Sequence, residues 1–422
     1  MVPAIGPASP STVASTRVPF GSNLDGAEQL LNRLLAVRQH SEALIAPLAP
    51  EDLCLQGMAD ASPPKWHLGH TTWFFDTFVL SPHLVDWPPL EQQWGFLFNS
   101  YYDALGARHP RPQRGLLTRP PIEAVLAWRE RVDRGLEQLL AQLAHLAPEQ
   151  AARPFQLLEL GLHHEQQHQE LLLMDVLDGF SRNPLEPAYR LGLEANPPPG
   201  TGDGANWYAH PGGLVEIGHG DPQTFAFDNE GPRHRVWLEP FALARRLVSN
   251  AEYAAFIADG GYRRPELWMS EGWAVVQARG WCAPRYWRDG QWEFTLAGRQ
   301  RLQSEAPVRH LSWFEADAYA RWAGAWLPSE AEWEVGAETA QLEGAFASLW
   351  QWTGSPYRPY PGFQAAAGAV GEYNGKFMSS QFVLRGSSNL TPPGHARLTY
   401  RNFFGPASRW MASGLRLARD PA

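Results

Sequence analysis

The chain has 422 residues and only two cysteines, Cys54 and Cys282, which are too few for a disulfide framework. It contains no apolar run approaching the roughly 18 residues that a membrane-spanning helix needs. Residues 1–20 have neither a basic start nor a sustained apolar stretch, which argues against a signal peptide. These absences predict a cytoplasmic protein without a membrane partner.

Excess positive charge is also lacking. The formal net charge is −9, which disfavours nucleic acids and anionic membranes as partners. Hydrophobic residues make up 44% of the chain and charged residues 19%, an ordinary globular balance that at this length predicts two or three domains. Nothing in the sequence indicates an obligate protein partner, so small molecules are the expected ligands.

The chain divides into parts with different patterns. Four stretches of the first half carry apolar residues at helical spacing, which predicts a bundle. The second half shows short strands, tight turns and two short helices that begin after Ser249 and Ser329. Most of the 19 tryptophans lie there, where aromatic packing would hold long loops. We therefore predict a disordered tail at 1–23, a helical bundle at 24–183, a linker at 184–206 and a second domain at 207–422.

A group of histidines in the fourth helical stretch is the strongest functional signal. The helix predicted from Pro154 to Gly179 contains the string HHEQQH, with His164 and His168 four residues apart. Residues i and i+4 stack on one helix face, so the two imidazoles can converge on one ion. Taken alone, the pair is explained equally well by two buried histidines that hydrogen-bond within a core.

A third histidine favours a metal site. His70 lies in the helical stretch Lys65–Asp76, on a face shared with Trp66 and Trp73, and is expected to point into the interior. His67 fits this face less well and is expected outside the ligand set. Three neutral imidazoles from two helices can hold a metal and leave positions open for substrate. The spacing suits zinc and ferrous iron equally.

Two other regions carry recognisable strings. Between the helices lies the long polar segment Phe96–Asp103, followed by the basic, Pro-rich Arg108–Arg114; a loop of this kind inside a helical domain is typically functional. The second half contains GPRHRV, LPSEAEWE, LWQWT, VLRGS and GLRL, which together resemble the formylglycine-generating-enzyme-type fold, an irregular relative of C-type lectins. Formylglycine formation would need a copper-holding cysteine pair in this half. Only Cys282 is present there, so we reject that activity.

The helical half resembles DinB-like metal-binding bundles. The two modules in this order, the three histidines and the string YRNFF at 400–404 resemble the ergothioneine-biosynthesis sulfoxide synthases, whose branches include the selenoneine synthases. The resemblance implies the fold class α + (α+β), a DinB-like four-helix bundle followed by a C-type-lectin-like formylglycine-generating-enzyme-type domain. It also implies a non-haem Fe(II) enzyme with O₂ as co-substrate, which joins a thiol or selenol donor to C2 of the imidazole of hercynine, the trimethylated betaine of histidine.

The same resemblance implies roles for individual residues. They are the iron ligands His70, His164 and His168, the hercynine-binding residues Gln167, Asn402, Phe403 and Phe404, the catalytic tyrosines Tyr101 and Tyr102, and the donor-binding residues Asp60 and Arg111. One family branch places its catalytic tyrosine in the second domain, where this chain has Val370. The chain instead resembles the branch with paired tyrosines on the helical domain. Core packing remains an alternative role for the two phenylalanines.

Two segments depart from the family pattern, Glu91–Gly95 and Arg385–Thr391, and both are expected near the donor side of the pocket. They leave cysteine and a selenosugar as near-equal candidates for the donor. Two other functions stay open. A zinc-dependent DinB-type thiol transferase would also use three histidines, and a lectin-like binding module could carry a structural metal. The former needs no second domain, and the latter needs a fourth ligand that the sequence does not offer.

Overall fold

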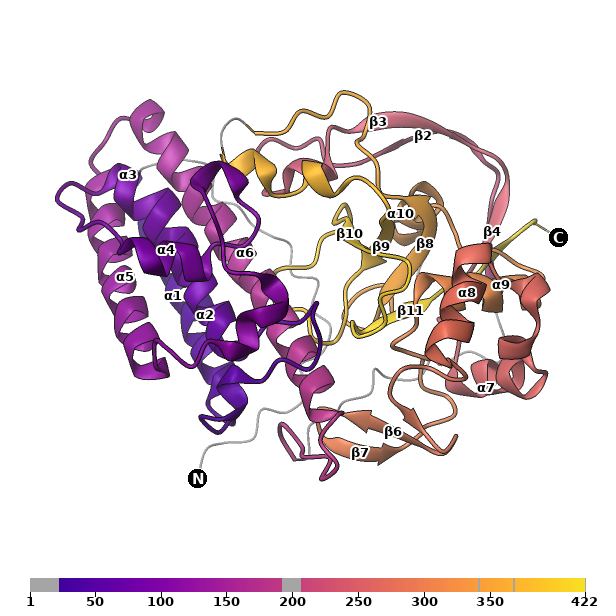
Figure 1. Ribbon diagram of the computed structural model, residues 1–422. Helices are drawn as coiled ribbons and strands as arrows, with labels where there is room; N and C mark the ends of the chain where they lie inside the picture. The colour runs from indigo at the N-terminus through magenta and orange to yellow at the C-terminus, as the bar shows by residue number, and fades with distance from the viewer. Residues whose placement is uncertain (1–22, 192–205, 341, 367–368, 422) are drawn as a thin grey trace.

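The computed structural model describes residues 23–191, 206–340, 342–366 and 369–421 (Figure 1). The predicted tail at 1–23 lies outside these residues except for its last position, and so does most of the predicted linker at 184–206. No helix in the described part of the chain is both long enough and apolar enough to cross a membrane.

The N-terminal half is a bundle of helices, drawn in indigo to magenta in Figure 1. Its helices are α1 (Asn23–Ile45), α2 (Pro64–Phe74), α3 (Ser81–His83), α4 (Gln92–Phe98), α5 (Ile122–Leu143) and α6 (Pro148–Phe180). The four helices predicted from apolar spacing correspond to α1, α2, α5 and α6, which confirms the bundle. Every residue of α2 is buried, so this helix forms the interior of the domain.

Two boundaries differ from the prediction. Helix α6 begins at Pro148 and contains Pro154, where we expected the helix to start. Pro148 lies in the first turn, where proline is well tolerated. Pro154 lacks the N–H of a helical hydrogen bond, and the burial of Ala151 and Phe155 on the same side offsets this loss. The segment expected as a loop from residue 96 begins with the last turn of α4, because Phe98 packs into the core.

The second half is an irregular α+β domain with small sheets. Its strands are β1 (Trp207–His210), β2 (Gly213–Ile217), β3 (His234–Leu238), β4 (Phe241–Ala244), β5 (Trp287–Arg288), β6 (Trp292–Thr295), β7 (Gly298–Arg301), β8 (Trp350–Pro356), β9 (Phe382–Gly386), β10 (Asn402–Phe404), β11 (Ser413–Leu415) and β12 (Ala418–Arg419). They form the sheets β10-β9-β8-β11, β1-β4-β12, β5-β6-β7 and β2-β3. In the four-stranded sheet only β8 and β11 run parallel.

Four helices accompany these sheets, α7 (Asn250–Ala258), α8 (Ser270–Arg279), α9 (Trp313–Trp322) and α10 (Glu330–Thr339). Ser249 and Ser329 cap α7 and α10 as predicted, each accepting a hydrogen bond from a backbone N–H three residues later. Two of these helices are expected from their N-terminal serines, whereas the described residues of this half form four. The tryptophans do hold loops, as expected: Trp352 donates to the carbonyl of Leu311, and Trp313 donates to that of Thr353.

Helix α6 lies on the side of the bundle that faces the second domain and contacts it (Figure 1). The buried carboxylate of Glu170 accepts hydrogen bonds from the Trp350 indole at 2.8 Å, from the Ser388 hydroxyl at 2.5 Å and from the Thr391 hydroxyl at 2.7 Å. The segment Arg385–Thr391, expected at the donor side of the pocket, therefore serves as an anchor between the domains.

Replacing Glu170 by Ala should destabilise this interface, because the Trp350 indole and two hydroxyls lose their acceptor inside it. An unsatisfied buried group costs about 1–3 kcal/mol, so we expect a loss of about 3–5 kcal/mol in the free energy of unfolding, measured by urea titration. Glu137→Ala on the exposed surface of α5 is the control and should change it little. A Glu170→Ala protein as stable as that control would contradict the anchor.

Glu170→Gln adds a test through pH. Burial raises the pKa of Glu170 despite its three hydrogen bonds. A carboxyl group with a raised pKa stabilises the fold while it is protonated, and that contribution is lost as the pH rises through its folded-state pKa. The parent protein should therefore lose stability over this range, whereas Glu170→Gln should not.

Candidate metal centre

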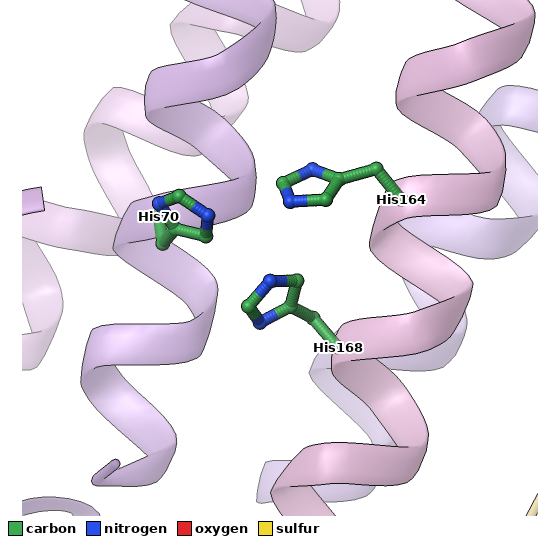
Figure 2. A group of neighbouring side chains, drawn as sticks. All are labelled: His70, His164 and His168. Carbon is green, nitrogen blue, oxygen red and sulfur yellow. The ribbon is translucent and has the colours of Figure 1, made fainter. Parts of the chain in front are cut away.

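Three histidines meet inside the bundle, His70 from α2 and His164 and His168 from α6 (Figure 2). Their rings point toward one another, and one nitrogen of each lies within 4.8 Å of the others. The exposed fractions are 0%, 0% and 8%, so little water competes for these nitrogens. The predicted ligand set is thus brought together in one place.

The local sequence explains how His70 is held. The backbone at Gly69 is covered by the Phe98 ring, and a Cβ at this glycine would lie 2.1 Å from a ring carbon. This close approach lets the Phe98 carbonyl accept a hydrogen bond from Nδ1 of His70 at 2.7 Å. The other nitrogen, Nε2, is buried, has no hydrogen-bond partner in the described part of the chain, and faces the histidine cluster.

His168 is held by a different partner. Its Nδ1 lies 2.8 Å from Nδ1 of His67, whose Nε2 lies 3.1 Å from the Asp175 carboxylate. His164 has no hydrogen-bond partner at either nitrogen among the described residues, although both nitrogens are buried. Buried imidazole nitrogens without partners are unusual in proteins, and the cluster therefore fits a metal ion.

The electrostatics of the cluster suit neutral ligands. Burial lowers the pKa of His164 to about 3, and burial together with the neighbouring histidines lowers the pKa of His168. All lone pairs are thus free to bind a metal without competition from protons near neutral pH. Three nitrogen ligands leave open positions in a tetrahedral or octahedral shell, and this donor set does not by itself choose between zinc and iron.

The two predicted tyrosines are connected to this cluster through other aromatic rings. Tyr102 is fully buried against Trp73, which stacks on His70, and its hydroxyl has no partner among the described residues. Tyr101 packs against Tyr102 with ring centroids 5.2 Å apart. Burial raises the pKa of both phenols, so each keeps its proton at neutral pH. Each is therefore a neutral phenol rather than a phenolate.

A third tyrosine that the sequence did not reveal comes from the second domain. The Tyr373 ring lies 5.5 Å from the His164 ring and 5.9 Å from the Tyr101 ring, measured between centroids. We had considered Val370, three residues earlier, as the corresponding position. Tyr373 also lines a cavity of about 280 Å³ between α6 and the second domain, whose wall includes Leu157 and Leu160.

The predicted hercynine-binding residues lie on both sides of the domain interface. Gln167 donates a hydrogen bond to the Tyr400 hydroxyl at 2.5 Å, so this α6 residue faces the second domain. The Asn402 side-chain oxygen accepts the backbone N–H of Phe403, whose ring stacks on Tyr357 at 4.1 Å. Phe404 packs against the core, which is the alternative role left open for it.

The predicted donor-binding residues Asp60 and Arg111 are both exposed, and no ion pair joins them within the described residues. Their role in holding the two ends of cysteine stays a prediction. Arg114, one turn after Arg111, is buried instead: its guanidinium lies 3.4 Å over the Trp66 ring and donates to the Ser62 hydroxyl at 2.9 Å. Burial and the neighbouring Arg111 lower the pKa of Arg114 to about 9. The Pro-rich sequence around Arg111 and Arg114 does not indicate which of the two arginines is buried.

Comparisons with known proteins agree with this architecture. Residues 33–172 match the model of the DinB superfamily, and residues 202–348 match that of the sulfatase-modifying factor enzyme 1-like domain. These two matches confirm the predicted fold class.

Individual relatives match this chain over different shares of its length. The hercynine oxygenase of Mycolicibacterium smegmatis is 32% identical over 308 residues, which cover 62% of this chain and 71% of that protein. The hercynine oxygenase of Mycobacterium tuberculosis is 33% identical over 240 residues, 46% of this chain and 56% of that protein. The formylglycine-generating enzyme of Thermomonospora curvata is 36% identical over 149 residues, 31% of this chain and 47% of that protein.

Removing any one histidine of the cluster should abolish tight metal binding. We expect His70→Ala, His164→Ala and His168→Ala each to weaken binding of Fe(II) or Zn(II) by more than the roughly 10–100-fold that loss of an outer partner costs. Metal content after dialysis and competition with a chelator measure this. His145→Ala on the exposed surface is the control. A triad variant that keeps the parent's affinity would remove that residue from the ligand set.

Proposed function

The chain belongs to the ergothioneine-biosynthesis sulfoxide synthase family, and we propose that it is an iron-dependent oxidoreductase that joins a chalcogen donor to C2 of the hercynine imidazole. The observation that carries this proposal is the buried triad of His70, His164 and His168, which Trp73 connects to the neutral phenol of Tyr102. Two relatives are named hercynine oxygenases, which fits a centre built for oxygen chemistry.

Iron fits the proposed reaction better than zinc. Zinc has no redox chemistry, whereas the oxidative coupling of a donor to hercynine needs a metal that reacts with O₂. His70, His164 and His168 would hold Fe(II), which would supply open positions for the donor's thiolate or selenolate and redox chemistry with O₂. Neutral ligands preserve the positive charge that favours the ionised form of the donor.

Hercynine would lie at the domain interface, between the triad and the second domain. Gln167 is adjacent to the ligand His168 and can present its amide to an imidazole nitrogen, with Tyr400 fixing its orientation. Asn402 and the aromatic side chains of Phe403 and Tyr373 offer an amide and π faces. A carboxylate and a quaternary ammonium, the two ends of hercynine, are recognised by these two kinds of group.

A phenol supplies the proton that the coupling consumes. We assign this role to Tyr101 or Tyr102, because Tyr102 is fully buried, Tyr101 is half-buried, and both keep their protons at neutral pH. Tyr102 has the freer hydroxyl, since no described residue accepts or donates to it. A proton delivered next to the metal favours coupling over simple oxidation of the donor.

The proposed donor is either a thiol such as cysteine, or a selenosugar. These two kinds of donor differ in charge. Cysteine carries an ammonium and a carboxylate, to which Asp60 and Arg111 would bind if they turned inward on substrate binding. Arg114 is already buried near the triad and offers a cation without a carboxylate partner within the described ranges. A selenosugar would not require either charge.

Anaerobic reconstitution tests the proposed function. The protein is loaded with Fe(II), mixed with hercynine and one of cysteine, γ-glutamylcysteine or a selenosugar, and then exposed to O₂, with products read by mass spectrometry. We expect a coupled hercynine product with one donor, only with iron and only with O₂. Zinc-loaded protein is the matched control. A product formed by the zinc protein without O₂ would point to a thiol transferase, and unconsumed hercynine with every donor would refute the proposal.

Changing the phenols should alter the products rather than binding. Tyr101→Phe and Tyr102→Phe remove a hydroxyl from each ring but keep its packing, so affinity for iron and hercynine should stay within about twofold. For a thiol donor, one of the two variants should shift the products from the coupled sulfoxide toward the donor's sulfinate. Mass spectrometry gives the product ratio. Ratios equal to the parent's in both variants would contradict the assigned role.

A further inference from the structure

A line of buried polar groups leads away from the triad inside the bundle. Nδ1 of His168 lies 2.8 Å from Nδ1 of His67, and Nε2 of His67 lies 3.1 Å from Oδ2 of Asp175. His67 precedes His70 by one turn of α2, and Asp175 follows His168 by two turns of α6. All three groups are buried, so their hydrogen bonds are made with one another and not with water.

The protons of this line can be placed by elimination. Oδ2 of Asp175 already accepts the backbone N–H of Ser62 at 2.7 Å, and a carboxylate oxygen can only accept. Nε2 of His67 must therefore carry the hydrogen that it donates to Asp175. A neutral imidazole has one N–H, so Nδ1 of His67 carries no hydrogen. Its lone pair accepts a hydrogen bond from Nδ1–H of His168.

With the hydrogen of His168 on Nδ1, its Nε2 carries a lone pair that is free to bind a metal. We propose that His67 and Asp175 form an outer shell of the metal centre, which fixes His168 in the Nδ1–H tautomer and strengthens it as a ligand. This inference rests on the metal site within the proposed function and not on the identity of the substrates. His67 and Asp175 are positioning residues, since neither reaches the metal.

The three ligands are held in three different ways. His70 donates Nδ1–H to the neutral carbonyl of Phe98, whereas His168 donates into a line that ends on a carboxylate. His164 has no hydrogen-bond partner at either nitrogen within the described residues and is held by packing against Phe74, with ring centroids 4.8 Å apart. A ligand that donates toward a carboxylate is more basic than one that donates to a carbonyl. His168 is therefore the ligand whose basicity the protein raises, and through which it adjusts the strength of metal binding.

The proposal revises the expectation for His67. The sequence places it outside the ligand set, and a residue outside that set with no further role could be removed without loss of metal binding. With the outer shell in place, loss of the ring still leaves three ligands but frees His168 to adopt either tautomer and to turn. Partners of this kind typically contribute 10–100-fold to metal affinity.

The test compares three variants of the full chain. His67→Leu removes both hydrogen bonds, His67→Gln keeps an amide that can accept from His168 and donate to Asp175, and Asp175→Asn keeps an acceptor oxygen but removes the charge. Thr72→Val is the matched control, because it deletes a buried hydroxyl of α2 that bonds only within its own helix and to Arg129. Apparent affinity for Fe(II) and for Co(II) is measured by chelator competition, without any substrate.

We expect His67→Leu to bind both metals about 10–100-fold more weakly than the parent and His67→Gln to recover most of this loss. Asp175→Asn should fall between them and shift the visible absorption of bound Co(II), which reports ligand basicity. Thermal unfolding of the metal-free proteins separates a structural role from the proposed one. If His67→Leu lowered the unfolding temperature as Thr72→Val does but bound metal like the parent, the proposal would be overturned.

Two further outcomes are decisive. Equal losses in His67→Leu and His67→Gln would overturn the tautomer assignment. A parent protein that binds neither metal tightly would overturn both this inference and the proposed function. A protein that binds metal as expected but consumes no hercynine would refute the function alone, because the outer shell is measured without substrate.

Discussion

A buried carboxylate between two arginines sets the rotation of α6, and the functional site depends on that rotation. Glu165 accepts hydrogen bonds from Arg38, Arg129 and Ser41 in the interior of the bundle. Burial by itself would raise its pKa, but the two guanidiniums hold the pKa of Glu165 below the ordinary value. An ionised group so deep inside a protein is costly to leave unpaired, so α6 cannot turn about its axis without breaking this cluster.

Successive residues of a helix are turned by about 100°, so fixing one side chain fixes the faces of the others. With Glu165 directed at α1 and α5, His164 and His168 face α2 and complete the triad. Glu170 is then directed at the second domain, where Trp350 meets it. One helix thus presents a structural face, a metal face and an interface face. Nε2 of His70 and both nitrogens of His164 lack partners among the described residues, a cost of about 1–3 kcal/mol for each buried group, which metal binding would offset.

The parts of the site that depend on helix geometry could be predicted from the sequence, and the parts that depend on tertiary placement could not. The i, i+4 spacing of His164 and His168 predicts their shared face, and the apolar neighbours of His70 predict that it points inward. Spacing carries no information on which carbonyl or carboxylate lies beyond a ring, so the role of His67 was missed. Arg111 and Arg114 sit in a loop without periodicity, where nothing distinguishes the exposed cation from the buried one. Tyr373 reaches the triad from a segment about 200 residues away from His164 in sequence, a contact that only the assembled domains create.

That dependence on assembly extends to the phenols of the bundle itself. The segment that carries Tyr101 is held by the second domain: Lys376 donates to the Tyr101 carbonyl, and the Glu372 carboxylate accepts the backbone N–H groups of Asp103 and Ala104 at 3.1 and 3.0 Å. The bundle holds the same segment from the other side, because Tyr102 is fully buried against Trp73. The bundle provides the three histidines, and both domains restrain the segment that carries the phenols. Because a proton donor acts only within hydrogen-bonding reach of its acceptor, the proposed role of these phenols depends on contacts from both domains.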